Sequence, residues 1–421
     1  MHPQAQVLAC TELVRRVLSF MQPADREVSA FFREHRTLGP RDRAVLAETA
    51  YRVLRRRLVL QHLAQSGTGP LPRRLVLLAW QGTDAYLKAG VAENEWAWLQ
   101  QVRAVDVAAL PARVRCNLPD WLVAPLQESV GEPAWDAFLE AMEQPAPLDL
   151  RVNTFKARRE EVLQRLQTGG LVCAATPHSP WGLRLQGKPA LQKVAAFEQG
   201  EVEVQDEGSQ LLALLTDAHR GEMVVDFCAG AGGKTLALGA AMRNTGRLYA
   251  FDTSGHRLAA LKPRLSRSGL SNVHPVQIAH ERDDRIKRLA GKIDRVLVDA
   301  PCSGLGTLRR NPDLKWRQTP ESVTELAALQ RAILQSAARL LKPGGRLVYA
   351  TCSLLEEENE RVVADFLAAQ PQFSVLPAAD ELQRLKVETA QTLCSGPYLR
   401  LWPHRHGTDG FFAAVFVRQP A

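Results

Sequence analysis

The sequence predicts an α/β protein whose main part is an open, mostly parallel sheet, preceded by a helical region and a small α+β unit. Three observations support this prediction. From about residue 206 onward, short apolar runs alternate with helical segments, which is the pattern of strand–helix–strand units. Two of these runs, 296–299 and 346–351, suit strands that are buried on both faces. Residues 1 to about 100 lack strand signals, and their apolar residues recur at helical spacing.

We expect three regions along the 421 residues. An all-α region spans 1–105, a linker with a small α+β unit spans 106–204, and the sheet domain spans 205–421. Pro119 and Asp120 predict the start of a helix inside the linker. The α+β unit is indicated by a helix over 158–166 and by strands over 181–185 and 201–205. In the sheet domain we expect strands at the following ranges: 223–227, 247–252, 296–299, 346–351 and 413–417, with a turn at 342–345 before the fourth of them.

Composition restricts the partners and the compartment. The formal net charge of +8 favours a polyanionic partner. Seven cysteines without a Cys-x-x-Cys pair argue against a zinc site or a disulfide framework, so we expect no metal, reduced thiols and a cytoplasmic location. Arg15 and Arg16 interrupt the only apolar stretch near the N-terminus, which argues against a signal peptide. No window is apolar enough to span a bilayer, and we expect a monomer without a membrane partner.

The helical region carries a dense group of arginines with few acidic residues nearby. A basic helical bundle is the expected structure. Runs of charge usually form a solvated face, but this density of one sign is also typical of a surface that binds RNA. Both interpretations remain open from the sequence. The arginines concerned are Arg41, Arg43, Arg52, Arg55, Arg56 and Arg57.

Two cysteines follow apolar strands at equivalent places. Cys302 comes after Asp299-Ala300-Pro301, and Cys352 comes after Thr351. In an open α/β sheet the chemistry lies just beyond the carboxyl ends of the strands. Neighbouring strands lie ~4.8 Å apart, so two such thiols could face one substrate. A lone free cysteine usually packs in a core, but a pair at equivalent strand ends favours a catalytic role.

A glycine-rich turn opens a helix directly after the first strand of the sheet domain. Its residues are Cys228, Ala229, Gly230, Ala231, Gly232, Gly233 and Lys234. Such a turn lets a ligand approach backbone amides at a helix N-terminus. A Walker motif would need glycine where Cys228 stands, and the spacing of a dinucleotide motif is also absent. A nucleoside cofactor without a pyrophosphate fits best, and S-adenosylmethionine is the obvious candidate, with its methionine end over this turn.

Asp252 ends the second expected strand, 19 residues past Gly233. An acid at this distance commonly binds ribose hydroxyls, which predicts a role in holding the cofactor. The alternative is that Asp252 caps the helix that follows.

Several motifs together resemble the Nol1/Nop2/Sun family of RNA 5-methylcytosine methyltransferases, most closely its bacterial RsmB type. The resemblance runs from about Leu118 to the C-terminus, and the helical N-terminus resembles that type's NusB-like RNA-binding module in a shortened form. The pairing of a Pro-Cys strand end with a Thr-Cys strand end is specific to this family. The motifs are Asp206 to Gln210, Cys228 to Thr235, Asp299 to Gly304, Asn311 to Asp313, Lys315-Trp316, Thr351 to Ser353 and Asp409 to Phe412.

The sequence departs from the family at two places. Gly230 and Ala231 stand where the family usually has Ala-Pro in the glycine turn. The family's third acid, which usually contacts the adenine side of the cofactor, should lie near His280, where this chain has none at the matching position. Asp283 or the His280 ring could substitute for it.

The resemblance implies a Rossmann-like S-adenosylmethionine-dependent methyltransferase that methylates carbon 5 of a cytosine in RNA, with small-subunit ribosomal RNA as the expected substrate. It implies Cys352 as the nucleophile that bonds to carbon 6, because carbon 5 alone is a poor nucleophile. It implies that Cys302 assists the final elimination and that Asp299 binds ring nitrogen N3 close to the cofactor. The alternatives are the same chemistry on transfer RNA, or a non-catalytic RNA-binding factor for ribosome assembly.

A basic and aromatic stretch beyond Cys302 is expected to contact the RNA backbone and to stack on a base. For Trp316 packing inside the protein is an equal alternative. The residues are Arg309, Arg310, Lys315, Trp316 and Arg317.

Overall fold

The structure is a computed structural model that describes residues 1–420. By their contacts the residues form two compact units. The first contains Met1–Pro145 together with Thr307–Pro320, and the second contains Ala146–Gly306 and the chain from Glu321 onward. Nothing in the sequence indicates that the segment 307–320, which we call the strap, packs with the N-terminal helices.

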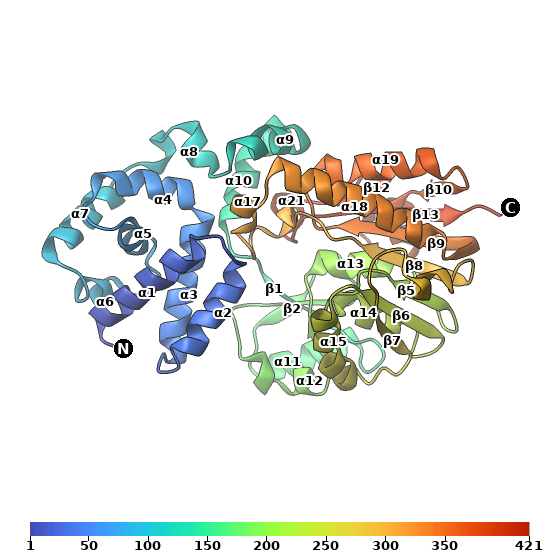
Figure 1. The fold of residues 1–421 in the computed structure, drawn as a ribbon. Coiled ribbons are helices and arrows are strands. Elements are labelled where there is room, and N and C mark those ends of the chain that lie inside the picture. Colours follow the sequence, from blue (N-terminus) through green and yellow to red (C-terminus); the bar gives the residue numbers. More distant parts are fainter. Residues whose placement is uncertain (421) are drawn as a thin grey trace. The chain divides into compact units, whose positions relative to one another are not determined.

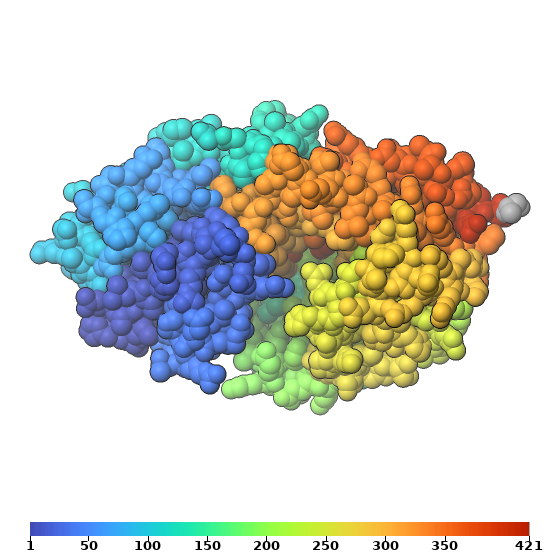
Figure 2. All heavy atoms as spheres, in the orientation of Figure 1, coloured from blue at the N-terminus to red at the C-terminus, as the bar shows by residue number. Residues whose placement is uncertain are grey.

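The first unit is all-helical, as the sequence predicts (Figure 1). Its buried residues recur at helical spacing, with Val7, Cys10, Leu13, Val14 and Val17 of the first helix all inside the core. The atoms of the N-terminal helices, drawn in blue in Figure 2, form a continuous surface. Its helices are α1 (Pro3–Val17), α2 (Ala24–Glu34), α3 (Pro40–Arg55), α4 (Arg57–Leu63), α5 (Leu71–Ala79), α6 (Asp84–Lys88), α7 (Glu93–Arg103), α8 (Ala112–Cys116), α9 (Asp120–Val130), α10 (Trp135–Glu143) and, in the strap, α17 (Leu314–Arg317).

The strap is held by main-chain atoms of the helical unit. The Lys315 ammonium donates to the carbonyl oxygens of Arg55 (3.0 Å) and Asn117 (2.7 Å). The Trp316 indole N–H donates to the carbonyl oxygen of Leu54 at 2.9 Å. Lys315 is 5% exposed, so it is a buried structural group. The expectation that Lys315 contacts RNA is therefore wrong, and for Trp316 the indole bond supports the alternative of packing inside the helical unit.

The central arginines of α3 and α4 also have partners within this unit. Arg55 is buried and donates to the carbonyl oxygen of Arg309 at 3.0 Å. Arg56 pairs with Glu143 at 3.2 Å, and the Arg57 guanidinium lies 4.9 Å from the centroid of the Trp316 ring. These three side chains are therefore not a freely solvated face.

Lys315 makes the stability of the protein depend on pH. Burial lowers its pKa from 10.5 to about 7. Between these values the unfolded chain binds more protons than the folded chain, so the free energy of unfolding rises with pH by up to about 1.4 kcal/mol per unit. We expect Lys315→Met to remove this contribution. Urea unfolding at pH 7, 8 and 9 should show a wild-type-minus-variant difference that grows with pH. A difference independent of pH would show that Lys315 does not titrate in this range.

The second unit begins with a small four-stranded sheet, which confirms the predicted α+β part. The strand order is β2-β3-β1-β4, and all pairs are antiparallel. Val162 and Leu166 of its longer helix pack into the core of this sheet with Leu150 and Leu183. The elements are β1 (Leu148–Val152), β2 (Cys173–Ala175), β3 (Gly182–Leu185), β4 (Val202–Val204), α11 (Arg159–Thr168) and α12 (Ala195–Glu198).

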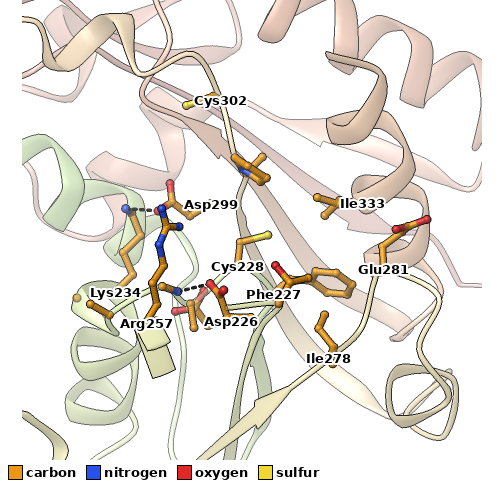
Figure 3. A pocket seen from close by; sticks show the side chains of 18 of the residues that line it. Asp226, Phe227, Cys228, Lys234, Arg257, Ile278, Glu281, Asp299, Cys302 and Ile333 are labelled. Carbon is orange, nitrogen blue, oxygen red and sulfur yellow. Dashed lines mark hydrogen bonds and ion pairs between the residues drawn. The ribbon is translucent and has the colours of Figure 1, made fainter. Parts of the chain in front are cut away.

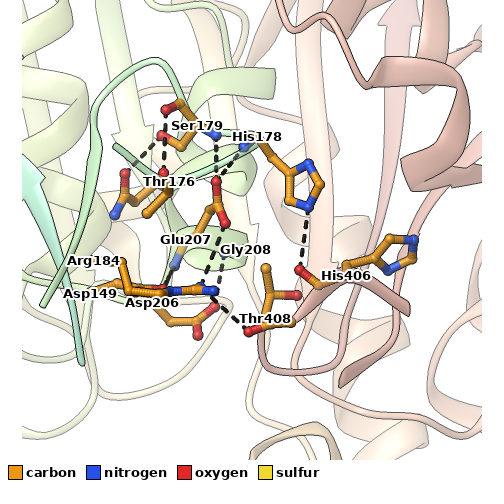
Figure 4. A network of polar contacts seen from close by, with 12 residues as sticks. Asp149, Thr176, His178, Ser179, Arg184, Asp206, Glu207, Gly208, His406 and Thr408 are labelled. Atoms are coloured by element: carbon orange, nitrogen blue, oxygen red, sulfur yellow. Dashed lines mark hydrogen bonds and ion pairs between the residues drawn. The ribbon is translucent and has the colours of Figure 1, made fainter. Parts of the chain in front are cut away.

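A buried polar network joins the small sheet to the main sheet domain (Figure 4). Glu207 opens α13 (Glu207–Leu215) and accepts hydrogen bonds from the main-chain N–H groups of His178 (2.6 Å) and Ser179 (2.7 Å). Asp149 of β1 pairs with Arg184 of β3 and also accepts from the Glu207 main-chain N–H. The motif Asp206 to Gln210 is thus a structural joint.

The main sheet confirms the predicted Rossmann-like arrangement. Its order is β11-β12-β13-β9-β8-β5-β6-β7, with β10 paired to β13. The pairs from β7 to β9 are parallel, and those that involve β13 are antiparallel. The strands are β5 (Met223–Asp226), β6 (Arg247–Asp252), β7 (Val273–Gln277), β8 (Ile293–Asp299), β9 (Leu341–Thr351), β10 (Phe373–Leu376), β11 (Cys394–Ser395), β12 (Tyr398–Leu401) and β13 (Phe411–Arg418).

Helices cover both faces of this sheet. Alternate residues of each central strand enter two separate cores: Leu297 and Val348 pack on one side, Val298 and Tyr349 on the other. The two faces explain why β8 and β9 are apolar throughout. The helices of this domain, besides α13, are α14 (Gly233–Ala241), α15 (Gly255–Ser268), α16 (Asp284–Lys287), α18 (Pro320–Ala338), α19 (Glu360–Ala369), α20 (Ala378–Arg384) and α21 (Pro403–His406).

Residues 342–345, expected to form a turn before a strand, lie within strand β9 instead. Strand β9 already pairs at Leu341 with Ile293, and the pairing resumes between Arg346 and Arg295. The intervening residues form an irregularity within β9, with Gly344 at a φ of 77°. The glycines thus interrupt a longer strand.

Two further properties concern residues 1–420 only. Their longest apolar helices fall short of what a membrane crossing requires. Within the same residues, no group of three or more His, Cys, Asp or Glu side chains is arranged to hold a metal ion.

Candidate active site

A cavity of about 770 Å³ lies at the carboxyl ends of β5, β6, β8 and β9 (Figure 3). It belongs wholly to the second unit. Strand β5 lies between β6 and β8, so the chain reverses its direction of winding there, which is where open α/β sheets bind ligands. All the predicted site residues line this cavity except Gly232.

The two cysteines meet at one point of the cavity. Strands β8 and β9 are parallel neighbours, with Asp299 opposite Ala350. The main-chain N–H of Gly306 donates to the carbonyl oxygen of Cys352 at 2.8 Å, which ties the loop after Cys302 to the end of β9. The Sγ atoms of Cys302 and Cys352 are 3.3 Å apart. The juxtaposition expected from equivalent strand ends is therefore present.

The two thiols have different surroundings. The hydrogen bond to Cys352, reinforced by burial, raises the pKa of the Cys302 thiol well above its ordinary value. Cys302 therefore stays protonated at neutral pH.

Lys234 supplies a positive charge beside the thiols. Its ammonium donates to Asp299 Oδ2 at 2.6 Å. Burial lowers the pKa of Lys234, but the charge of Asp299 and the hydrogen bond outweigh this effect and raise it overall. The same side chain lies within electrostatic reach of Cys352. The sequence alone did not indicate which group would place a positive charge here.

The glycine turn connects β5 to α14. Gly230 and Gly232 have φ angles of 55° and 83°, which glycine adopts without a steric penalty. A Cβ atom on Gly232 would lie 2.1 Å from Leu261 Cδ1, so this glycine is required for packing against α15. A Cβ atom on Gly230 would meet no atom within 4 Å. The turn thus presents open backbone at the N-terminus of α14.

Asp252 lies at the end of β6 and braces this turn. Its Oδ2 accepts from the main-chain N–H of Gly230 at 2.8 Å, and its Oδ1 accepts from that of Ser254 at 2.7 Å. The side-chain cap of α15 is Ser254, which accepts from the N–H of Arg257. The alternative in which Asp252 caps this helix is therefore wrong, and its carboxylate remains on the cavity wall.

Sequence reasoning missed Asp226, the last residue of β5. Its Oδ2 accepts from the Thr235 hydroxyl at 2.7 Å, while its buried Oδ1 has no hydrogen-bond partner. Burial raises the pKa of Asp226 to about 7. A buried polar atom without a partner on a cavity wall fits a ligand that offers a donor. Its place at a strand end, directly before the glycine turn, is the signal that could have identified it.

The far side of the cavity is mostly apolar. Phe227, Ile278 and Ile333 gather there with Glu281, opposite Lys234 and Asp299 (Figure 3). This surface suits a flat, apolar ring such as a nucleobase.

Of the two residues expected to replace the missing acid, only His280 lines the cavity. Both carboxylate oxygens of Asp283 accept main-chain N–H groups of its own loop, those of Ala279 and Arg285, at 2.9 Å each. Asp283 is therefore a helix cap for α16. Glu281 is the acid that the cavity contains on this side.

Comparison with known proteins decides the family. A model described as 16S rRNA methyltransferase RsmB/F matches residues 213–417. A second model, for the ferredoxin-like domain of RsmF/B-like methyltransferases, matches residues 118–192. The chain belongs to the RsmB/F family. The first match contains the cavity's strand ends, and the second covers most of the small sheet.

Individual members of the RsmB/F family are similar over most of this chain. "Probable ribosomal RNA small subunit methyltransferase B" of Synechocystis sp. is 38% identical over 299 residues, 71% of this chain and 66% of that protein. Ribosomal RNA small subunit methyltransferase B of Erwinia tasmaniensis is 34% identical over 302 residues, 72% of this chain and 66% of that protein. The match spans just under two thirds of the length of these relatives. The crystal structure of PH0851 matches with a TM-score of 0.78 at 28% identity, covering 99% of each chain.

Proposed function

We propose that this member of the RsmB/F family transfers a methyl group from S-adenosylmethionine to carbon 5 of a cytosine in small-subunit ribosomal RNA. The observation that carries the proposal is the pair of thiols, 3.3 Å apart, beside the Lys234–Asp299 ion pair in one cavity. The names of the similar proteins support ribosomal RNA as the substrate. The net charge of +8 supports a polyanionic one.

The cavity fits the cofactor. In this proposal Asp252, on the cavity wall, accepts the ribose hydroxyls, and Phe227 and Ile278 offer the apolar surface for the base. The open backbone of the turn from Cys228 to Gly233 suits the methionine end, and the unpaired Oδ1 of Asp226 suits a donor on the ligand. When bound, S-adenosylmethionine supplies an electrophilic methyl group on its sulfonium.

The residues at the strand ends account for the rest of the reaction. The Cys352 thiolate adds to carbon 6 of the cytosine, and the electron pair of the 5,6 double bond moves to carbon 5, which can then accept the methyl group. A base next removes the proton from carbon 5. The double bond re-forms as the carbon–sulfur bond breaks, and the electron pair of that bond returns to Cys352 Sγ. The one bond between the protein and the base, the carbon–sulfur bond of Cys352, is thus formed and then broken, and the thiolate is regenerated.

The neighbours of Cys352 take complementary roles. Lys234 stabilises the thiolate before attack and again when it leaves. In this proposal Asp299 shares a proton with N3 of the base: N3 takes the proton as the addition delocalises electron density onto the ring, and returns it to the carboxylate on elimination. Cys302, close to the same carbon–sulfur bond, assists the elimination that frees the RNA. The base must leave its stack to reach these groups.

The proposal is tested by methyl transfer in vitro. The full chain is incubated with methyl-labelled S-adenosylmethionine and a transcript of small-subunit ribosomal RNA, and the RNA is digested to nucleosides. We expect label only in 5-methylcytidine. A parallel reaction with transfer RNA decides between the two RNA classes. Label in another nucleoside, or none in either RNA, would contradict the proposal and favour a non-catalytic assembly factor.

Asp252→Ala is expected to weaken the binding of S-adenosylmethionine. A hydrogen bond from a hydroxyl to a carboxylate contributes about 1.5–3 kcal/mol, so the dissociation constant should rise roughly tenfold to over a hundredfold. Calorimetry with the full chain measures it. Asp284→Ala is the matched control, because this exposed aspartate of α16 pairs with Lys287 and does not line the cavity. Equal affinities in the two variants would remove Asp252 from the cofactor site.

A further inference from the structure

One buried carboxylate contacts the loops of both cysteines. Glu358, which is fully buried, accepts a hydrogen bond from the main-chain N–H of Ser303 at 2.8 Å and another from the Ser303 hydroxyl. It also accepts from the hydroxyl of Ser353. Ser303 directly follows Cys302, and Ser353 directly follows Cys352. A single side chain therefore lies under both thiol-bearing loops.

Other contacts fix Glu358 in turn. Gln330 of α18 donates to Glu358 Oε1 at 3.0 Å, and the Tyr349 hydroxyl donates to the main-chain carbonyl of Glu358. The Ser303 and Ser353 hydroxyl oxygens are 3.2 Å apart, so the two loops also contact each other above the carboxylate. All of these groups are buried.

Glu358 is the common acceptor of this cluster. Its two oxygens accept one main-chain N–H, two hydroxyls and one side-chain amide. Four donors, from the two cysteine loops and from α18, converge on this one fully buried side chain, which calls for a reason beyond packing. Aligning the two loops supplies that reason.

We propose that Glu358 is a positioning residue that sets the separation and orientation of the Cys302 and Cys352 thiols. Its effect on catalysis rests on the proposed function, whereas its effect on the geometry of the thiols does not. Glu358→Gln keeps the shape of the side chain but turns an amide donor toward groups that themselves donate. We expect the loops to separate, and the thiols with them.

The geometry is measured by forming a disulfide. A dipyridyl disulfide reacts with one thiolate, which displaces the first thiopyridone and leaves a mixed disulfide. The second thiolate attacks that mixed disulfide and displaces the second thiopyridone. The reagent is thereby reduced and the two protein thiols are oxidised to a Cys302–Cys352 bond, which peptide mass spectrometry identifies. In the wild type, with 3.3 Å between the sulfur atoms, the second step should be fast.

In Glu358→Gln we expect the second step to slow at least about tenfold, since misplacing reacting groups by about 1 Å costs up to ~100-fold. Glu356→Gln is the matched control: it makes the same change at an exposed glutamate two residues away and should behave as the wild type. Ser303→Ala and Ser353→Ala each remove one hydroxyl and should slow the step less. They also keep the test valid if Glu358→Gln does not fold.

Methylation kinetics provide the second arm. A positioning role predicts a lower kcat in Glu358→Gln with an unchanged affinity for S-adenosylmethionine, because Asp252 and the glycine turn are on other strands. If disulfide formation is slow in Glu358→Gln but even the wild type does not methylate RNA, the positioning role of Glu358 is upheld and the proposed function is refuted. Disulfide formation at the wild-type rate in Glu358→Gln and in both serine variants would overturn the inference.

Discussion

Cys352→Ala is expected to abolish both methylation and any covalent complex with RNA, whereas Cys302→Ala should accumulate that complex. Cys352 forms the bond to carbon 6, so nothing can follow without it. Cys302 acts after methyl transfer, so its loss lets the bond form but blocks its breakdown. On a denaturing gel, Cys302→Ala incubated with cofactor and RNA should give a shifted band that nuclease treatment removes.

Cys394→Ala is the control for this pair, since that cysteine lies on β11, away from the residues that line the cavity. It should retain wild-type activity and give no shifted band. A shifted band with Cys352→Ala instead would reverse the two roles. Full activity in both Cys302→Ala and Cys352→Ala would leave the thiols as packing residues.

Lys234→Met is expected to slow formation of the covalent complex by about tenfold to a thousandfold. The change removes the cation beside Cys352 and leaves the Asp299 carboxylate, 2.6 Å from the lost ammonium, without its ionic partner. The range follows from the typical cost of removing one preorganised charged group that stabilises charge in an active site. The rate is followed by gel shift in the Cys302→Ala background, where the complex does not break down.

Lys262→Met provides the control for Lys234, because Lys262 is an exposed lysine on α15 and does not line the cavity. It should leave the rate unchanged. The Lys234 variant should also alkylate more slowly at Cys352 with iodoacetamide at neutral pH, even without RNA. Equal alkylation rates would show that Lys234 does not stabilise the thiolate.

The central strands and the place of the site were predictable because local signals carry them. An apolar strand followed by a polar loop marks a strand end, and Cys302 and Cys352 both follow such strands. The glycine turn is equally local. Strands β7 and β10 to β12 were not predicted, since they are short or lie toward the edges of the sheet, where the pattern is weaker.

Contacts between residues far apart in the chain could not be predicted from the sequence. Trp316 and Lys315 resemble an RNA-contacting pair, yet their partners are carbonyl groups about 200 to 260 residues earlier. No local pattern encodes such a pairing. The role of Glu358 was missed for a related reason: its importance depends on Ser303, 55 residues away, lying beside Ser353.

Detection of a covalent bond between Cys352 and the cytosine is the most direct test of the proposed mechanism. Cys302→Ala is incubated with S-adenosylmethionine and small-subunit ribosomal RNA, digested with nuclease and protease, and the peptides are sequenced by mass spectrometry. The account predicts a methylated cytidine nucleotide attached to the peptide that contains Cys352. Methylated RNA together with an unmodified Cys352 peptide, or a nucleotide attached to any other residue, would contradict it.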